Sequence, residues 1–75
     1  MNTYKNLSER SGIDAYEVGT SFIKIRFKGS SNIYVYDASS PGLVHVERMK
    51  KLAVVGRGLA TYVNQNVKRE FSRIE

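Results

Sequence analysis

Cysteine and tryptophan are absent from this sequence, and proline and histidine each occur once. Without cysteine the chain can form no disulfide, no thiolate metal site and no thiol nucleophile, which fits a reducing compartment. No hydrophobic run approaches the roughly 18 residues of a membrane-spanning helix, and no signal-peptide core follows the first residue. We therefore expect a soluble, cytoplasmic protein.

Residue types that carry out catalysis are sparse as well. The single histidine, His45, has no cysteine to share a metal with, and a lone histidine needs an oriented partner to act as a general base. The seven acidic residues show no spacing that pairs two carboxylates. The segment Gly56-Arg57-Gly58 lacks the lysine and hydroxyl residue of a phosphate-binding P-loop. These absences predict that the protein is not an enzyme and needs no cofactor or metal.

Positive charge is in clear excess. Twelve lysine and arginine residues against seven aspartate and glutamate residues give a net charge of +5 in 75 residues, of which 41% are hydrophobic. This composition is typical of one small globular domain. The basic excess is either the footprint of a polyanion-binding protein or a solvated surface that keeps a small protein soluble. The positions of the charges have to decide between the two.

Strand signals occupy the first half of the chain. Residues 13–18 are typical of a short strand that ends at a turn over 19–21. In residues 22–28, three apolar residues alternate with three basic ones, so one strand face is apolar and the other cationic. The apolar set is Ile23, Ile25 and Phe27, and the basic set is Lys24, Arg26 and Lys28. A turn over 29–32 leads to a third strand ending at Asp37, whereas residues 1–12 carry no period and are expected to form a loose N-terminal arm.

Two helices are predicted after the strands. Pro41 suits the first turn of a helix and Ser40 can cap it, so the first helix should run to about Val55. The glycines of 56–58 end it, and a second helix should run from Gly58 to about Arg69. Its apolar stripe comprises Leu59, Tyr62, Val63, Asn66 and Val67, with Phe71 and Ile74 extending the stripe.

The predicted architecture is α+β: a three-stranded antiparallel meander followed by two helices that pack on one face, in the order β-β-β-α-α. A sheet this small cannot bury its apolar face alone, so the helices should cover it. The shared core is predicted to contain Ile23, Ile25, Phe27, Met49, Leu52, Leu59, Val63 and Val67.

Several segments, taken in order, match a known family. They run from Ile13 and Tyr16 through Ile23, Ile25 and Phe27 to the Tyr-x-Tyr of Tyr34 and Tyr36, then into Leu52-Ala53, Gly56, Gly58-Leu59, Tyr62-Val63-Asn64 and Val67. In this order and spacing the chain resembles the KTSC domain family, small domains also found at the C-terminus of some lysyl-tRNA synthetases. The resemblance implies a single KTSC-like domain over residues 13–75, with RNA binding as its suggested role, in a bacterial or phage protein.

The side of the sheet that Tyr34 and Tyr36 occupy depends on a strand register that the sequence leaves open. Among the basic residues, the two rings would form a stacking platform for the bases of single-stranded nucleic acid. On the side of Ile23 and Ile25, the rings would instead join the core, and the basic residues alone would form the binding face.

The sequence therefore predicts a non-catalytic module that binds nucleic acid, RNA in the first place, through a cationic surface. The expected contacts are Lys24, Arg26, Lys28, Tyr34, Tyr36, Lys50, Lys51, Arg57, Lys68 and Arg69. Two alternatives stay open. One is a transcription regulator that docks on a large acidic protein such as bacterial RNA polymerase. The other is a helix-turn-helix whose segment from Gly58 enters a DNA major groove. Neither a membrane nor a small-molecule substrate is expected.

Overall fold

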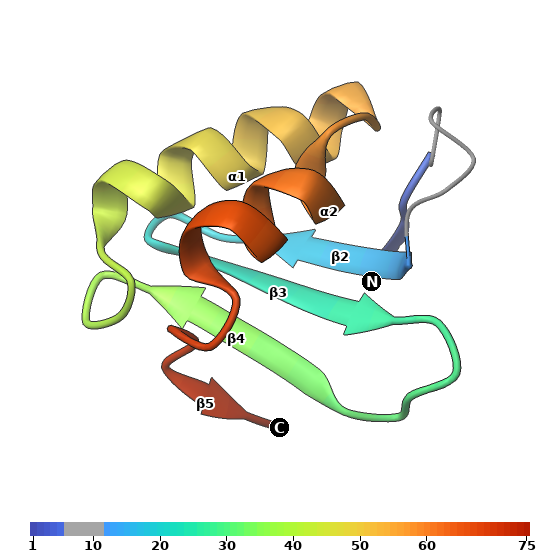
Figure 1. Ribbon diagram of the computed structural model, residues 1–75, viewed down its shortest axis with the longest axis horizontal. Coiled ribbons are helices and arrows are strands. Elements are labelled where there is room, and N and C mark those ends of the chain that lie inside the picture. Colours follow the sequence, from blue (N-terminus) through green and yellow to red (C-terminus); the bar gives the residue numbers. More distant parts are fainter. Residues whose placement is uncertain (6–11) are drawn as a thin grey trace.

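In the computed structural model, which describes residues 1–5 and 12–75, helical segments cover one face of an antiparallel sheet (Figure 1). Within these residues the sheet has five strands in the order β1-β2-β3-β4-β5. The predicted α+β class, the antiparallel sheet and the helices that follow the meander are confirmed. The prediction of three strands is wrong, because a short strand is added at each edge of the meander.

The central meander consists of β2 (Ile13–Val18), β3 (Phe22–Phe27) and β4 (Ile33–Asp37). The turn between β2 and β3 is tight, with the Gly19 amide donating to the Phe22 carbonyl oxygen at 2.9 Å. A Cβ atom at Gly19 would overlap the Phe22 ring, so a larger residue there would require that ring to move. All three strands agree with the segments that alternation and β-branched residues indicated.

The register between β3 and β4 places both tyrosines on the helix-covered face. Tyr36 lies opposite Ile23, and Tyr34 lies opposite Ile25. Cross-strand partners share a face of the sheet, so the two rings belong with the apolar residues. Of the two registers that the sequence allowed, the structure adopts the one that excludes an aromatic platform among Lys24 and Arg26.

The strand at the N-terminal edge is β1 (Asn2–Thr3), which pairs with β2. Tyr4 follows it into the core with 3% of its surface exposed, and its hydroxyl accepts a hydrogen bond from the Leu59 amide at 3.3 Å. The loose arm expected for residues 1–12 is therefore wrong for residues 2–4, because an aromatic anchor compensates for the lack of a periodic pattern. Residues 6–11 of that arm lie outside the described part of the chain.

The first helix, α1 (Leu43–Val55), begins later than predicted. Gly42 precedes it without a side-chain cap, and Ser40 instead donates its hydroxyl hydrogen to the Glu70 carbonyl oxygen at 2.7 Å. Pro41 follows a cis peptide bond and bridges to Asp37. The predicted cap is wrong because Asp37 closes its own turn, accepting hydrogen bonds from the Ser39 and Ser40 amides at 3.0 and 3.3 Å.

The second helical segment consists of α2 (Leu59–Tyr62) and a π-helical turn, η1 (Val63–Val67). It starts at Gly58, whose positive φ of 84° suits glycine, and it ends before Arg69. The chain then turns back and forms β5 (Arg73–Ile74), which pairs with β4. The prediction that Phe71 and Ile74 extend the helical stripe is wrong, although Phe71 still packs against the core.

The core lies between the sheet and the helical layer. Six of the predicted core residues are buried, and Phe27 and Leu52 are partly buried against them. The structure adds Tyr4, Ile13, Tyr36, Val46 and Ala53. Across the described residues, no helix has the length and apolar character to cross a bilayer.

A candidate ligand pocket between the sheet and the second helical segment

The face of the sheet that the helices do not cover, the open face, carries positive charges that form ion pairs with carboxylates. The Lys24 ammonium contacts the Glu75 carboxylate at 2.9 Å, and the Arg26 guanidinium contacts the Asp14 carboxylate at 2.8 Å. The Lys24 and Arg26 side chains are 23% and 40% exposed. The cationic strand face expected from the alternation in β3 is therefore largely neutralised. Lys28 lies beyond the end of β3, is exposed, and has no ion-pair partner among the described residues.

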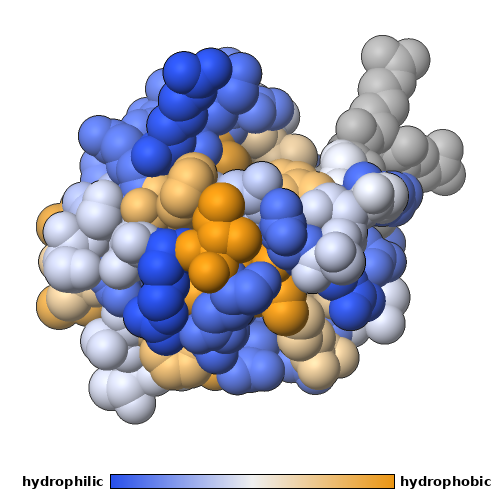
Figure 2. Space-filling view, turned by 90° about the horizontal axis from the view of Figure 1, so that it is seen from below, coloured by the Kyte–Doolittle hydropathy of each residue, from blue (hydrophilic) through white to orange (hydrophobic). Residues whose placement is uncertain are grey.

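Lys24 and Arg73 both lie beside Val35 in the register of the open face, and Val35 is only 1% exposed. The aliphatic stems of long charged side chains can cover apolar surface in this way. Arg73 also contacts Glu75 at 2.9 Å. Seen from below, on the side where β4 and β5 lie in Figure 1, hydrophobic atoms are bordered by hydrophilic ones (Figure 2). On this face, the ion pairs of Lys24 and Arg73 with Glu75 therefore surround the apolar side chain of Val35.

The basic residues predicted on α1 and in the joint that follows it are not brought together with the tyrosines. Lys50 contacts Glu47 at 2.9 Å and donates to the Thr20 carbonyl oxygen at 3.2 Å. Lys51 and Arg57 are exposed and make no ion pair within the described part of the chain.

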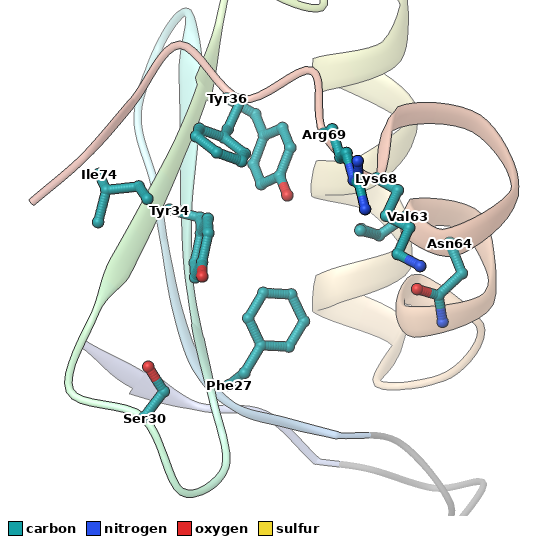
Figure 3. A pocket seen from close by; sticks show the side chains of 10 residues that line it. Phe27, Ser30, Tyr34, Tyr36, Val63, Asn64, Lys68, Arg69 and Ile74 are labelled. Carbon is teal, nitrogen blue, oxygen red and sulfur yellow. The ribbon is translucent and has the colours of Figure 1, made fainter.

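Two of the predicted basic residues do share a site with the tyrosines. A pocket of about 500 Å³ opens between β3, β4 and β5 on one side and the second helical segment on the other. Figure 3 shows aromatic residues of the sheet facing Asn64, Lys68 and Arg69. The pocket is lined by Phe27, Ser30, Tyr34, Tyr36, Val63, Asn64, Lys68, Arg69, Phe71 and Ile74.

The aromatic wall is built from edge-to-face contacts. The ring of Tyr34 meets Phe27 at 5.4 Å and Phe71 at 5.0 Å between centroids, with interplanar angles of 77° and 76°. Tyr36 meets Phe71 at 6.3 Å and 89°. Such pairs hold each other in place, and each adds roughly 0.5–1.5 kcal/mol beyond its buried area. Because Phe27, Tyr34 and Phe71 are only partly buried, they keep ring surface open to the pocket.

Tyr36 forms part of the pocket floor and is 1% exposed. Its ring extends from β4 toward the second helical segment, so the hydroxyl points into the space between the two (Figure 3). Burial, followed by the effect of the neighbouring Tyr34, raises the pKa of Tyr36 from its usual 10.0 to about 12. The phenol is therefore a neutral hydrogen-bond donor at every physiological pH.

The opposite wall supplies the charge. Lys68 and Arg69 are exposed at the end of η1, and neither has an ion-pair partner among the described residues. The π-helical turn before them is a rare geometry that is common at functional sites. Within it Asn66 donates to the Tyr62 carbonyl oxygen at 3.2 Å, whereas Asn64 lines the pocket. The site thus combines aromatic surface, phenol hydroxyls and two free cations.

The remaining candidates for chemistry have structural roles. The His45 ring nitrogen Nδ1 and the Tyr62 hydroxyl lie 2.7 Å apart and join α1 to α2. In the described residues, histidine and acidic side chains form no group of three or more that could hold a metal ion.

Sequence reasoning found Tyr34, Tyr36, Lys68 and Arg69 but missed most of the pocket. The sequence pattern predicts that Phe71 extends the apolar stripe of the second helix, whereas the pocket depends on the chain reversing after Val67. Phe27 was identified only as core, and it is in fact a wall residue that is partly buried. In the sequence, Asn64 appears only among the residues that carry the KTSC resemblance, and it lines the pocket. The usable signal was the density of aromatic residues, because five tyrosines and three phenylalanines occur in only 75 residues.

No family model, curated protein or solved structure matches this chain. The resemblance to the KTSC domain family accordingly stays a prediction.

Proposed function

We propose that this chain is a non-catalytic module that binds single-stranded nucleic acid, with RNA as its ligand. The observation that carries the proposal is the pocket, where four aromatic side chains face Lys68 and Arg69, two basic residues with no ion-pair partner in residues 1–5 and 12–75. Proteins that bind single strands combine base stacking on aromatic side chains with Lys and Arg contacts to phosphates.

We propose the pocket, and not the open face of the sheet, as the contact surface. The sequence favoured the open face, but Lys24 and Arg26 already have carboxylate partners there. A phosphate would have to compete with those carboxylates, whereas at Lys68 and Arg69 it meets no carboxylate partner among the described residues. Lys28 supports the same surface, since it lies in the hairpin between the pocket residues Phe27 and Ser30.

RNA is preferred to DNA on the strength of the KTSC resemblance, and unpaired strands are preferred to duplexes on the strength of the pocket. A base inside a duplex cannot reach an aromatic pocket without leaving its stack. The structure gives the helix-turn-helix alternative little support, because Leu59, Val63 and Val67 are buried and the regular α-helical part of the second segment, α2, has only four residues before the π-helical turn.

Fluorescence anisotropy with a labelled single-stranded RNA of about 12 nucleotides tests the proposal. We expect micromolar or weaker binding that falls between about 50 and about 200 mM salt, with a log–log slope near −0.7 for each phosphate neutralised. The matching RNA duplex should bind more weakly. The double variant Lys68→Ala/Arg69→Ala should lose affinity.

The matched control is Arg48→Ala/Lys51→Ala, which removes the same charge from exposed positions of α1 outside the pocket. Its affinity should stay close to that of the parent. Absence of binding at low salt, or equal losses in the two double variants, would contradict a site at the pocket.

A second candidate is docking to an acidic protein such as bacterial RNA polymerase. One observation favours it: the solvent side of α1 exposes Val44, Val54 and Val55 at 73%, 59% and 57%, and Lys51, which lies beside Val54 and Val55, has no ion-pair partner within the described part of the chain. Exposed apolar residues with a basic neighbour suit a protein interface better than a nucleic acid. Binding to purified RNA polymerase after nuclease treatment, abolished in a Val54→Asp variant, would favour docking over RNA.

A further inference from the structure

The Tyr36 hydroxyl is the most informative group in the pocket. It makes no hydrogen bond to any described residue, although only 1% of the residue's surface is exposed. Among those residues no side-chain oxygen or nitrogen is both sealed from solvent and unpaired, so this hydroxyl must open on the pocket. A buried phenol usually finds a partner, and here the partner has to come from whatever fills the pocket.

The rings around that hydroxyl define the shape of the occupant. Phe27, Tyr34 and Phe71 hold one another edge to face, which leaves partly exposed ring surface on several sides of one space. A flat, unsaturated group fits such a space better than a branched aliphatic one. The volume of about 500 Å³ is within the range of small-ligand sites and too small for more than one or two such groups.

The cations define a second part of the occupant. Lys68 and Arg69 line the same pocket from the opposite wall and have no acidic partner within the described chain. An Arg guanidinium and a Lys ammonium side by side are suited to a phosphate, which offers several acceptor oxygens. The occupant therefore joins a planar base-like ring, with a hydrogen-bond acceptor on its edge, to an anion.

We propose that this pocket binds a single nucleotide unit. Its base enters among Phe27, Tyr34 and Phe71, the Tyr36 hydroxyl donates a hydrogen bond to the base edge, and Lys68 and Arg69 bind the phosphate. The inference rests on the proposed function and specifies it: of a bound strand, one unpaired base is turned into the pocket while the rest follows the outer surface.

The test compares a nucleoside 5′-monophosphate, the matching nucleoside and inorganic phosphate by NMR titration of the labelled protein. The monophosphate should shift the resonances of Tyr34, Tyr36, Phe71 and Lys68 together. The nucleoside should shift the aromatic resonances with weaker affinity, and phosphate alone should shift only those near Lys68 and Arg69. The variant Lys68→Ala/Arg69→Ala should weaken the monophosphate about tenfold and leave the nucleoside unchanged.

Tyr36→Phe isolates the hydroxyl. We expect an affinity loss of about fivefold for both the nucleoside and the monophosphate, which corresponds to one hydrogen bond. The variant should fold normally, because the hydroxyl makes no hydrogen bond to the described protein. Tyr16→Phe is the matched control, since it removes the same atom from a half-buried tyrosine that packs on Tyr4 outside the pocket. An equal effect of the two variants would overturn the assignment.

The outcomes separate the two proposals. If RNA binds and depends on Lys68 and Arg69, but no mononucleotide reaches the aromatic resonances, the nucleotide site is wrong and the RNA-binding proposal stands. If the mononucleotide enters and the oligonucleotide does not bind, the ligand is a free nucleotide, and RNA binding is wrong. If neither binds, both are wrong. Tighter binding of phosphotyrosine than of any nucleotide would reassign the pocket to a phosphorylated peptide.

Discussion

The two faces of the sheet carry basic residues in opposite circumstances. On the open face, Lys24 and Arg26 are held by Glu75 and Asp14, partners that lie 51 and 12 residues away in the sequence. On the other side, Lys68 and Arg69 stand beside an aromatic pocket with no acidic partner in the described chain. The basic residues of β3 form the most regular charge pattern in the sequence, yet they are less available to a ligand than Lys68 and Arg69. The basic residues along a strand are a poor guide to binding until the carboxylates that pair with them are known.

The ion pairs of the open face act mainly by neutralising charge. They are partly exposed, and exposed pairs contribute about 0–1 kcal/mol to stability at most. Their second effect is positional: Glu75 belongs to the chain end that contains β5, so its contact with Lys24 helps to hold Ile74 beside Tyr34 at the pocket. The open face therefore supports the geometry of the pocket on the other side of the sheet.

The largest difference between the faces should be in stability. Ile25 and Arg26 are neighbours in β3 that point to opposite sides, with Ile25 fully buried. We expect Ile25→Ala to lower the free energy of unfolding by about 2–4 kcal/mol, because it leaves a cavity between the sheet and α1. Arg26→Ala should cost about 1 kcal/mol or less. Urea denaturation followed by circular dichroism measures both. Equal losses would mean that the open face is part of the cooperative core.

The next prediction concerns RNA affinity. Lys68→Ala/Arg69→Ala should reduce affinity about tenfold or more at low salt and flatten the log–log salt slope by about 0.7 for each phosphate that is no longer neutralised. Arg26→Ala removes a charge that Asp14 already compensates and leaves Lys24 in contact with Glu75, so it should change affinity by less than about twofold. Anisotropy titrations at several salt concentrations check this. A larger decrease in the open-face variant would reverse the assignment of the two surfaces.

A third prediction uses the raised pKa of Tyr36, about 12 in the folded protein against 10.0 in an unfolded chain. Above pH 10 the unfolded state releases this proton and the folded state keeps it. The stability that this group contributes is therefore fully present below pH 10 and falls as the pH rises toward 12. Tyr36→Phe should lose less stability over that interval than the parent, while matching it at pH 7. Denaturant midpoints across the alkaline range provide the measurement, and parallel curves for the two proteins would count against it.

The smallest effect is expected on the open face in acid. The hydrogen bond from Lys24, followed by that from Arg73, lowers the pKa of Glu75, and the hydrogen bond from the Ser39 hydroxyl lowers that of Asp37. Both contribute stability above their unfolded pKa values, and that stability is lost as the pH falls below them. Lys24→Gln should reduce this acid dependence slightly, and added salt should do the same. Thermal unfolding between about pH 3 and pH 6 is the check; an unchanged dependence in Lys24→Gln would remove Lys24 as its cause.

Prediction from the sequence was best where the relevant interactions are short in range. The alternation in β3 and the glycines at 56 and 58 located a strand and a helix break, because each depends on neighbours a few residues away. Prediction failed at both edges of the sheet. The strands β1 and β5 have two residues each, too few for any period to show, and they exist because Tyr4 and Phe71 anchor the adjoining chain in the core.

By itself, the sequence determined the α+β class, the three central strands and most of the core, since apolar periodicity dictates which side of each element must be buried. Only the tertiary structure decided the face on which Tyr34 and Tyr36 lie, because a register shift of one residue reverses it. It also decided which basic side chains have a carboxylate partner among the described residues. Whether a charge is available depends on the carboxylates that folding brings to it, and those of Lys24 and Arg26 come from other parts of the chain.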